Sequence, residues 1–178
     1  LLKNISEMSK TILIIGFVWP EPKSSAAGYR ILQLISFFQK MNYRVVFASA
    51  AHKSEKTFNL SSQNVQEREI KINDSSFDNF IAELSPKIVM FDRFMVEEQF
   101  GWRVAKFSPN SIRILDTEDL HCLRKTRIEA YKKNSKVSDV LKDADITKRE
   151  IASIYRCDLS IIISEIEMSL LQNEFNIP

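Results

Sequence analysis

The sequence predicts an α/β fold: a doubly wound, three-layer α/β/α domain with a mainly parallel sheet of about six strands. Three observations lead to this prediction. Short apolar runs alternate with stretches in which apolar residues recur at helical spacing. The first run, residues 11–17, is rich in Ile, as expected of a strand covered on both faces. Alternating strands and helices form right-handed crossover units, which build a sheet with helices packed against it.

The N-terminal half supplies three expected strands and two helices. Apolar residues recur at helical spacing within residues 28–40, which predicts a helix after the first strand. Residues 44–48 form the second expected strand, and the polar, aperiodic residues 51–66 predict a surface loop. A short strand is expected at residues 69–72, followed by a short helix over residues 77–84 that a proline ends.

The C-terminal half continues the alternation. Residues 88–91 and 112–115 are the fourth and fifth expected strands, and residues 96–107 between them predict a helix. Residues 120–131 fit a helix imperfectly and are followed by a break at residues 134–136. Another helix, marked by Ile151, Ile154 and Tyr155, leads to a last strand at residues 159–163. Ser164 and Glu167 then form the Ser-x-x-Glu capping box of a final helix.

Polar residues directly follow three of these strands. The first strand runs into a loop over residues 18–28, the fourth into Asp92 and Arg93, and the fifth into residues 116–121. In an open parallel sheet, the ligand crevice lies outside the carboxyl ends of the strands. We therefore expect binding or chemistry at this edge of the sheet.

The first loop leads into a helix start made of small residues: Ser25, Ala26, Ala27 and Gly28, with Arg30 as a nearby cation. Small side chains let a ligand approach the backbone, and a helix N-terminus attracts phosphate. The alternative is a wide turn in which the small residues serve packing. Gly-x-Gly-x-x-Gly and Gly-Lys-Ser/Thr motifs are absent from the sequence, which disfavours a dinucleotide cofactor or a P-loop reaction.

The segment after the fifth strand holds four titratable groups in six positions: Asp116, Glu118, Asp119 and His121. His121 is a candidate general base, because the ordinary pKa of histidine lies near neutrality. Glu118 and Asp119 are close enough in sequence to orient or charge this ring. Carboxylates in the first helical turn are also ordinary partners of the helix dipole, but this density of titratable groups at a strand end favours a functional site over chance.

Other residues at this edge leave alternatives open. Asp92 and Arg93 either pair with each other or present an acceptor and a forked donor to sugar hydroxyls or a phosphate. Trp19 and Phe94 lie in loops, where their rings either stack on a carbohydrate or fill the loop. Trp102 lies in a predicted helix, and we expect it in the core.

The composition suits one globular domain over residues 1–178, with 44% hydrophobic and 27% charged residues. The net charge of +2 gives no general reason to expect nucleic acid. Two histidines and scattered carboxylates argue against a dedicated metal site. Cys122 and Cys157 fit no metal or redox spacing and indicate a reducing compartment. Residues 1–6 are too weakly apolar for a secretory signal, so we expect a cytoplasmic protein.

One basic stretch lies close behind the fifth strand and comprises Arg124, Lys125, Arg127, Lys132, Lys133 and Lys136. Its ordinary interpretation is a solvated helix face followed by a loop. The alternative is a surface attracted to anionic lipid or to a phosphorylated acceptor. That alternative would place the protein at the inner face of the membrane.

Four segments of the chain resemble the N-terminal domain of glycosyltransferases built from two facing Rossmann-like domains, the B-type fold. Residues 12–32 are similar to the first strand, small-residue loop and first helix of that domain, and residues 44–48 to its second strand. Residues 113–124 resemble the segment that lines the acceptor side of the cleft. Residues 150–167 resemble the last strand and helix before the linker between the domains.

The resemblance implies the acceptor-binding half of an enzyme that moves a sugar from a nucleoside-diphosphate sugar to an acceptor hydroxyl. A second domain, absent from this chain, would hold most of the donor, and the donor diphosphate would reach residues 25–28. Hydroxyls of a carbohydrate or lipid-linked acceptor would meet Asp92, Arg93 or the group at residues 116–121. No cofactor is expected, and the chain alone would be inactive. Two alternatives remain: a nucleotide-dependent single-domain enzyme, and a non-catalytic Rossmann-like module that binds a glycan or nucleotide.

Overall fold

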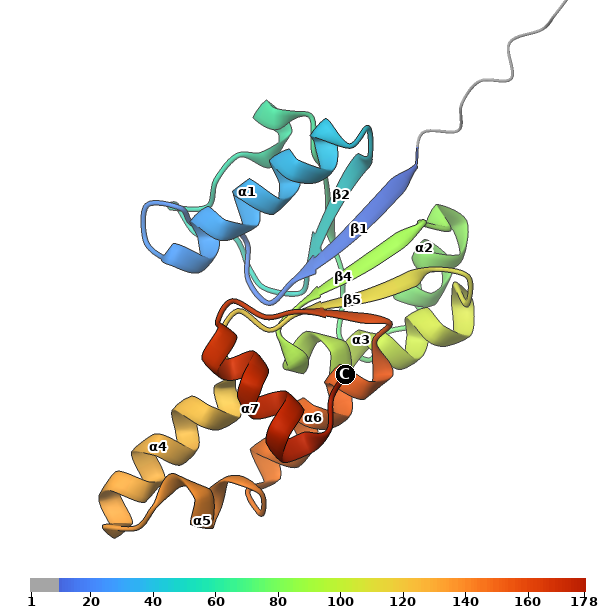
Figure 1. Ribbon diagram of the computed structural model, residues 1–178. Helices are drawn as coiled ribbons and strands as arrows, with labels where there is room; N and C mark the ends of the chain where they lie inside the picture. The colour runs from blue at the N-terminus through green and yellow to red at the C-terminus, as the bar shows by residue number, and fades with distance from the viewer. Residues whose placement is uncertain (1–9) are drawn as a thin grey trace, which may run out of the picture.

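A parallel sheet of six strands forms the centre of the protein in the computed structural model, which describes residues 10–178 (Figure 1). Residues 1–6, where we expect no secretory signal, lie outside the described range. The strand order is β3-β2-β1-β4-β5-β6, and every neighbouring pair is parallel. The predicted α/β fold with a parallel sheet is therefore confirmed.

The elements alternate along the chain as the sequence predicts. The strands are β1 (Thr11–Gly16), β2 (Arg44–Ser49), β3 (Gln66–Glu69), β4 (Ile88–Asp92), β5 (Ile112–Asp116) and β6 (Leu159–Ile161). The helices are α1 (Ala26–Lys40), α2 (Ser76–Leu84), α3 (Phe94–Phe107), α4 (His121–Lys133), α5 (Val137–Leu141), α6 (Asp145–Arg156) and α7 (Glu165–Phe175), with a short 3-10 helix, η1 (Leu60–Gln63).

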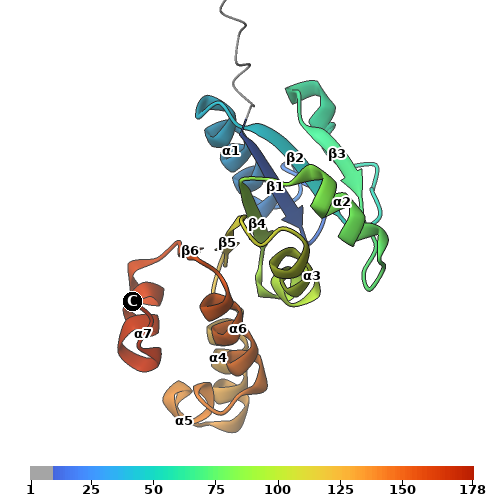
Figure 2. The ribbon, with the colours of Figure 1, turned by 90° about the vertical axis from the view of Figure 1, so that its right-hand side faces the viewer.

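The central strands pack against two separate cores, because successive side chains of a strand point to opposite faces of the sheet. Ile12 and Ile14 of β1 pack on the face that α1 covers. Leu13 and Ile15 pack on the other face, with apolar residues of α2, α3 and α6. Figures 1 and 2 show α1 on one side of the sheet and α2 and α3 on the other. The predicted three-layer arrangement is confirmed.

The strand order places a topological switch point between β1 and β4. These two strands are neighbours in the sheet, yet β1 leads into α1 on one face and β4 leads into α3 on the other. The connections therefore diverge at the carboxyl ends of the two strands. Ligands of open α/β sheets bind at such a point.

Two local expectations are wrong. The short strand expected at residues 69–72 is β3, three residues earlier, and η1 and the start of β3 occupy part of the expected loop. β3 is an edge strand with mostly exposed polar side chains, so the apolar signal came from buried Ile70, just beyond its end. Trp102 is not in the core: it is 51% exposed on α3, with the guanidinium of Arg103 4.5 Å from its ring centroid.

The capping box expected at the start of α7 forms only in part. The Ser164 side chain accepts a hydrogen bond from the backbone N–H of Glu167 at 3.4 Å. The Glu167 carboxylate, however, accepts from the backbone N–H of Leu120 at 3.2 Å rather than completing the box. It thereby joins α7 to the residue that precedes α4.

A second distant carboxylate caps α4 itself. Glu150 of α6 is fully buried and accepts hydrogen bonds from the backbone N–H groups of His121 at 3.1 Å and Cys122 at 2.7 Å. The residue before the helix, Leu120, offers no side-chain cap. Glu150 therefore fixes the start of α4 next to the titratable residues that follow β5.

We expect Glu150→Ala to lower the free energy of unfolding by about 2–5 kcal/mol, because it leaves two buried N–H donors without an acceptor. Urea denaturation followed by circular dichroism measures the change. The control is Glu129→Ala, which removes only the partly exposed pair with Lys133 and should cost about 0.5 kcal/mol or less. Equal losses in the two variants would contradict the capping role of Glu150.

Candidate functional site

A cavity of about 300 Å³ opens at the switch point. The first loop and the start of α1 form one side of it, and residues that end or follow β4 and β5 form the other. Its lining residues are Val18, Trp19, Pro20, Glu21, Ser25, Ala27, Gly28, Ile31, Asp92, Arg93 and Glu118. The structure thus brings the ends of three separate strands together around one cavity.

An ion pair between Arg30 of α1 and Asp116 of β5 lies beside this cavity. Nε and Nη2 of Arg30 donate to the two carboxylate oxygens of Asp116 at 3.1 and 2.9 Å. Asp116 is fully buried, whereas Arg30 stays partly exposed. The hydrogen bond to Asp116 raises the pKa of Arg30. Arg30 is therefore engaged by the protein itself and is not the free cation that phosphate binding would use.

Arg93 pairs chiefly with Glu118 rather than with its neighbour Asp92. Its Nε donates to Glu118 Oε2 at 2.8 Å, and its Nη2 lies 2.6 Å from the same oxygen. The distance from Arg93 Nε to Asp92 Oδ1 is 3.6 Å, too long for a hydrogen bond. The guanidinium group therefore joins the ends of β4 and β5.

Asp92 is the most unusual titratable group at the cavity. It is 3% exposed, and its Oδ2 accepts a hydrogen bond from the backbone N–H of Phe17 at 3.0 Å. Burial raises the pKa of Asp92 to about 7, outweighing the opposite effect of Arg93. Asp92 Oδ1 and Glu118 Oε1 are buried and have no hydrogen-bond partner within residues 10–178. Two acceptor atoms beside the cavity are thus unused by the protein.

Two residues at the cavity have backbone conformations that L-residues rarely adopt. Arg93 has φ 76° and ψ 155°, a region that glycine normally occupies, and Glu118 has φ 57°. The backbone N–H of Arg93 donates to the carbonyl of Asp116 at 2.8 Å, which holds this conformation in place. Such residues cost about 1–3 kcal/mol each and cluster at ligand sites.

His121 and Asp119 lie beside the cavity but do not line it. His121 Nδ1 is 3.2 Å from Arg124 Nη2, and Nε2 is 3.6 Å from Asp119 Oδ1. Burial, followed by the charge of Arg124, lowers the pKa of His121, which favours the neutral form of the ring. Of the four expected catalytic residues, only Glu118 reaches the cavity wall.

The two aromatic candidates are packed in the interior. Trp19 and Phe94 are each 2% exposed. The indole N–H of Trp19 donates to the carbonyl of Ala51 at 2.7 Å, and Phe94 begins α3 and meets the His121 ring edge-on. Trp19 forms part of the cavity wall, but both rings are almost fully covered, which matches the alternative in which they fill space rather than stack on a carbohydrate.

Gly28 is required by packing of the first loop. A Cβ atom at this position would lie 2.6 Å from backbone atoms of Glu21. The Ser25 hydroxyl accepts from the Gly28 N–H at 3.0 Å and caps α1. Ser25 and Ala27 line the cavity, whereas Ala26 is exposed outside it. The small residues therefore serve packing at Gly28 and leave room for a ligand at Ala27.

Sequence reasoning did not single out Phe17, Glu21 or Ile31 as site residues. Phe17 contributes through its backbone N–H, which carries no residue-specific signal. Ile31 lies three positions after Gly28, and this helical spacing places both on one face of α1. This helical spacing from Gly28 is the sequence signal that could have identified Ile31 as a cavity residue.

Residues 10–178 contain no group of three His, Cys, Asp or Glu side chains placed to hold a metal ion. Among the helices of the same range, none combines the length and apolar character that crossing a membrane requires.

We expect Asp92→Asn to remove a pH dependence of stability. The folded-state pKa of Asp92, about 7, lies above its ordinary value, so protonation of Asp92 favours the folded state. This stabilisation is complete below about pH 4 and is lost as the pH rises through 7, by up to about 4 kcal/mol. Urea denaturation across pH 4–8 measures it. Asp139→Asn, at an exposed position, should keep the pH dependence of the unmodified protein. The prediction would be contradicted if the free energy of unfolding of Asp92→Asn changed with pH in the same way as that of the unmodified protein.

We expect Gly28→Ala to lower the free energy of unfolding by about 1–3 kcal/mol, because the added methyl group overlaps the backbone of Glu21. Thermal denaturation measures the loss. Ala26→Ser, two residues earlier on the exposed side of the same helix turn, should change stability by less than about 0.5 kcal/mol. Unchanged stability of Gly28→Ala would contradict the prediction, because it would show that the backbone at Glu21 can move to accommodate the methyl group.

Neither a protein-family profile nor a curated protein sequence matches this chain. Among solved structures, a sucrose-phosphate synthase from Thermosynechococcus elongatus matches with a TM-score of 0.63. The match covers 92% of this chain and 44% of the synthase, at 12% sequence identity, so it concerns the fold alone. The synthase is a glycosyltransferase of the B-type fold. This chain thus has a Rossmann-like fold that fits one half of such an enzyme.

Proposed function

We propose that the chain is the acceptor-binding half of a glycosyltransferase that moves a sugar from a nucleoside-diphosphate sugar to an acceptor hydroxyl. The cavity at the switch point carries the proposal, because Asp92 and Glu118 line it and each has a buried carboxylate oxygen without a hydrogen-bond partner in residues 10–178. Carboxylate oxygens accept hydrogen bonds from hydroxyl groups, so a carbohydrate or lipid-linked acceptor would satisfy both. The similarity in fold to the synthase supports the class of reaction.

Asp92 is suited to receive the proton of the acceptor. In the proposed transfer, the acceptor oxygen bonds to the anomeric carbon and loses its proton, and the nucleoside diphosphate leaves with the bonding electrons. A base with a pKa of about 7 is present in both protonation states at neutral pH, as this step requires. Asp116 acts as a positioning residue, since Arg30 engages both its oxygens, and Asp119 and His121 border the site.

The donor diphosphate would meet the start of α1. The first N–H groups of a helix lack intrahelical acceptors, which favours an anion near Ala26 and Ala27. Arg30 and Arg93 are already paired with carboxylates, so neither guanidinium group is free to bind the diphosphate. Most contacts to the donor would therefore come from a second domain, and closure of the two domains would exclude water from the reacting atoms.

The pairing of Arg30 and Arg93 with carboxylates also favours one alternative, a non-catalytic module that binds a glycan. With both nearby guanidinium groups occupied, the cavity wall formed by the described residues offers carboxylates to hydroxyl groups but no unpaired cation to a phosphate. Such a module would bind sugars without any partner domain. Affinity for the sugar alone therefore separates the two functions.

Titration of the chain with monosaccharides and methyl glycosides, followed by 1H–15N NMR, tests the proposal. We expect shifts at Asp92, Arg93 and Glu118 with millimolar dissociation constants, and no sugar transfer when UDP- or GDP-sugars are added. Asp92→Asn and Glu118→Gln should each weaken sugar binding by about tenfold, because each replaces a charged acceptor of hydrogen bonds. Distant Asp139→Asn is the control and should bind normally.

Three outcomes would oppose the proposal. Micromolar binding of a sugar by this chain alone would favour the glycan-binding module. Micromolar binding of a nucleotide sugar would favour a nucleotide-binding protein of one domain. Transfer of sugar by the 178-residue chain would show that no second domain is needed.

A further inference from the structure

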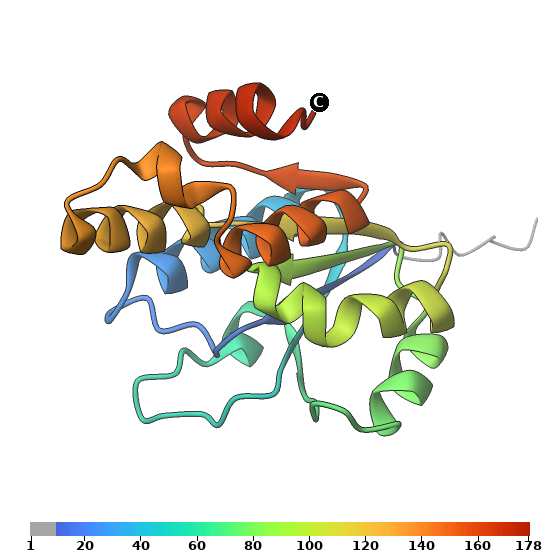
Figure 3. The same ribbon diagram turned by 90° about the horizontal axis from the view of Figure 1, so that it is seen from below.

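The positive charge of this protein is concentrated in one projecting part, residues 121–144, here called the helical arm. It comprises α4, α5 and their connections, and Figures 1 and 3 show it extending away from the sheet. The arm holds seven of the 25 Lys and Arg residues and three of the 23 Asp and Glu residues. In the remainder of the chain, acidic residues outnumber basic ones. The net charge of the whole chain, +2, therefore does not reveal that the helical arm is basic.

The exposed face of α4 presents two apolar side chains beside Arg124, which pairs with Asp119, and has further cations at its edges. Buried residues of α4 lie on one side of the helix, against the rest of the protein. At about 3.6 residues per turn, Ile128 and Tyr131 lie on the opposite side. These side chains are 51% and 89% exposed. Arg127 lies at one edge of this face, and Lys125 and Lys132 lie at the other.

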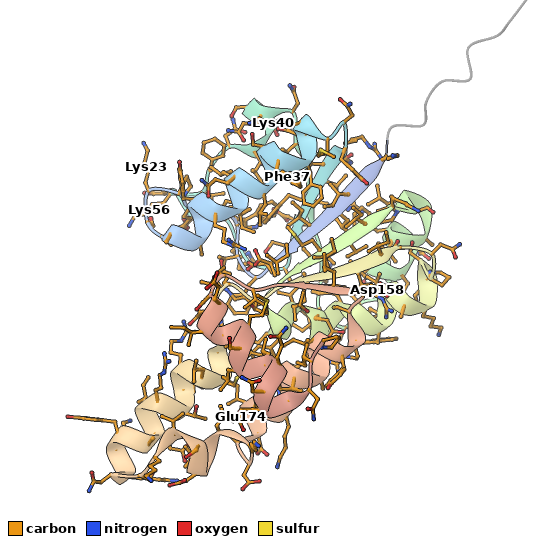
Figure 4. The ribbon with its side chains drawn as sticks, viewed as in Figure 1. Lys23, Phe37, Lys40, Lys56, Asp158 and Glu174 are labelled. Atoms are coloured by element: carbon orange, nitrogen blue, oxygen red, sulfur yellow. The ribbon has the colours of Figure 1, made fainter. Side chains whose placement is uncertain are left out.

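Arg124 pairs with Asp119, but the cations at the edges of this face are not neutralised by the described part of the chain. Within residues 10–178, Lys125, Arg127 and Lys132 make no ion pair, whereas Lys142 pairs with Glu174 of α7 at 2.8 Å. Figure 4 shows Glu174 next to the arm. The pair with α7 therefore lies at the inner side of the arm, and the outer cations remain available to a partner.

We propose that this face of α4, formed by Lys125, Arg127, Ile128, Tyr131 and Lys132, docks on an anionic lipid bilayer. Helices that lie in the membrane interface combine a basic flank with apolar and aromatic side chains that enter the headgroup region. Tyrosine is enriched at this depth. A nucleic acid would use the cations but leave Ile128 in water, so the central apolar pair favours lipid.

This inference goes beyond the proposed function and does not depend on it. α4 begins at His121, directly after the residues that border the cavity. Docking of α4 would therefore hold the cavity close to the membrane surface, where the hydroxyl of a lipid-linked acceptor is available. Loss of sugar binding would leave the lipid proposal intact, and loss of lipid binding would leave the cavity intact.

Flotation of the purified chain with vesicles tests the proposal. We expect binding to phosphatidylcholine vesicles that contain about 30 mol% phosphatidylglycerol, no binding to phosphatidylcholine alone, and release in about 0.5 M NaCl. Lys125→Gln/Arg127→Gln/Lys132→Gln should weaken binding by about 100-fold, since each cation near an anionic surface contributes about fivefold. Its matched control is Lys23→Gln/Lys40→Gln/Lys56→Gln, which removes the same charge from exposed positions around α1 and should bind normally (Figure 4).

A second variant tests the apolar centre of the face. Ile128→Ser/Tyr131→Ser keeps every charge and should weaken vesicle binding by about tenfold or more, because two side chains no longer enter the bilayer. Equal weakening by the two triple variants would overturn the proposal, since any surface charge would then serve. So would unchanged binding by Ile128→Ser/Tyr131→Ser, or tighter binding of duplex RNA than of anionic vesicles.

Discussion

The arrangement of the cavity depends on the ion pair between Arg30 and Asp116. Arg30 belongs to α1, and Asp116 ends β5, two strands away from β1 in the sheet. The pair therefore spans the carboxyl end of β4 and holds the first helix over the switch point. Asp116 is fully buried, and a buried charge without its partner costs about 3–5 kcal/mol. The buried carboxylate of Asp116 keeps this partner only while α1 stays in place.

The way the guanidinium groups of this edge are paired also bears on the pKa of Asp92. Three carboxylates and two guanidinium groups share this edge, and the guanidinium groups make their hydrogen bonds with Asp116 and Glu118. Asp92 receives one backbone N–H and only a distant contact with Arg93. Burial is then the dominant influence on Asp92, which explains its raised pKa. Burial that the neighbouring guanidinium groups do not offset thus leaves Asp92 with a pKa of about 7.

The strands and the gathering of their polar ends could be predicted from the sequence. Apolar runs define buried strands, and parallel strands must place their carboxyl ends at one edge, so Asp92, Arg93 and Glu118 had to meet. The ion pair between Arg30 and Asp116 could not be predicted, because the two residues are 86 positions apart and meet only through the strand order. The cap by Glu150 depends on how α6 packs. β3 was predicted three residues too late, because an edge strand need not be apolar and the apolar signal came from Ile70 beyond its end.

The two helices nearest the cavity differ in what their N-termini can bind. In α4, the carboxylate of Glu150 accepts from the first N–H groups, so the protein already supplies the anion. In α1, the Ser25 hydroxyl takes only the Gly28 N–H, and the N–H groups of Ala26 and Ala27 precede the first intrahelical bond. Between these two helices, a phosphate would therefore bind at α1. Because Arg30 is already paired with Asp116, that phosphate would be held by backbone dipoles rather than by this guanidinium group, so tight binding of a diphosphate needs further positive charge.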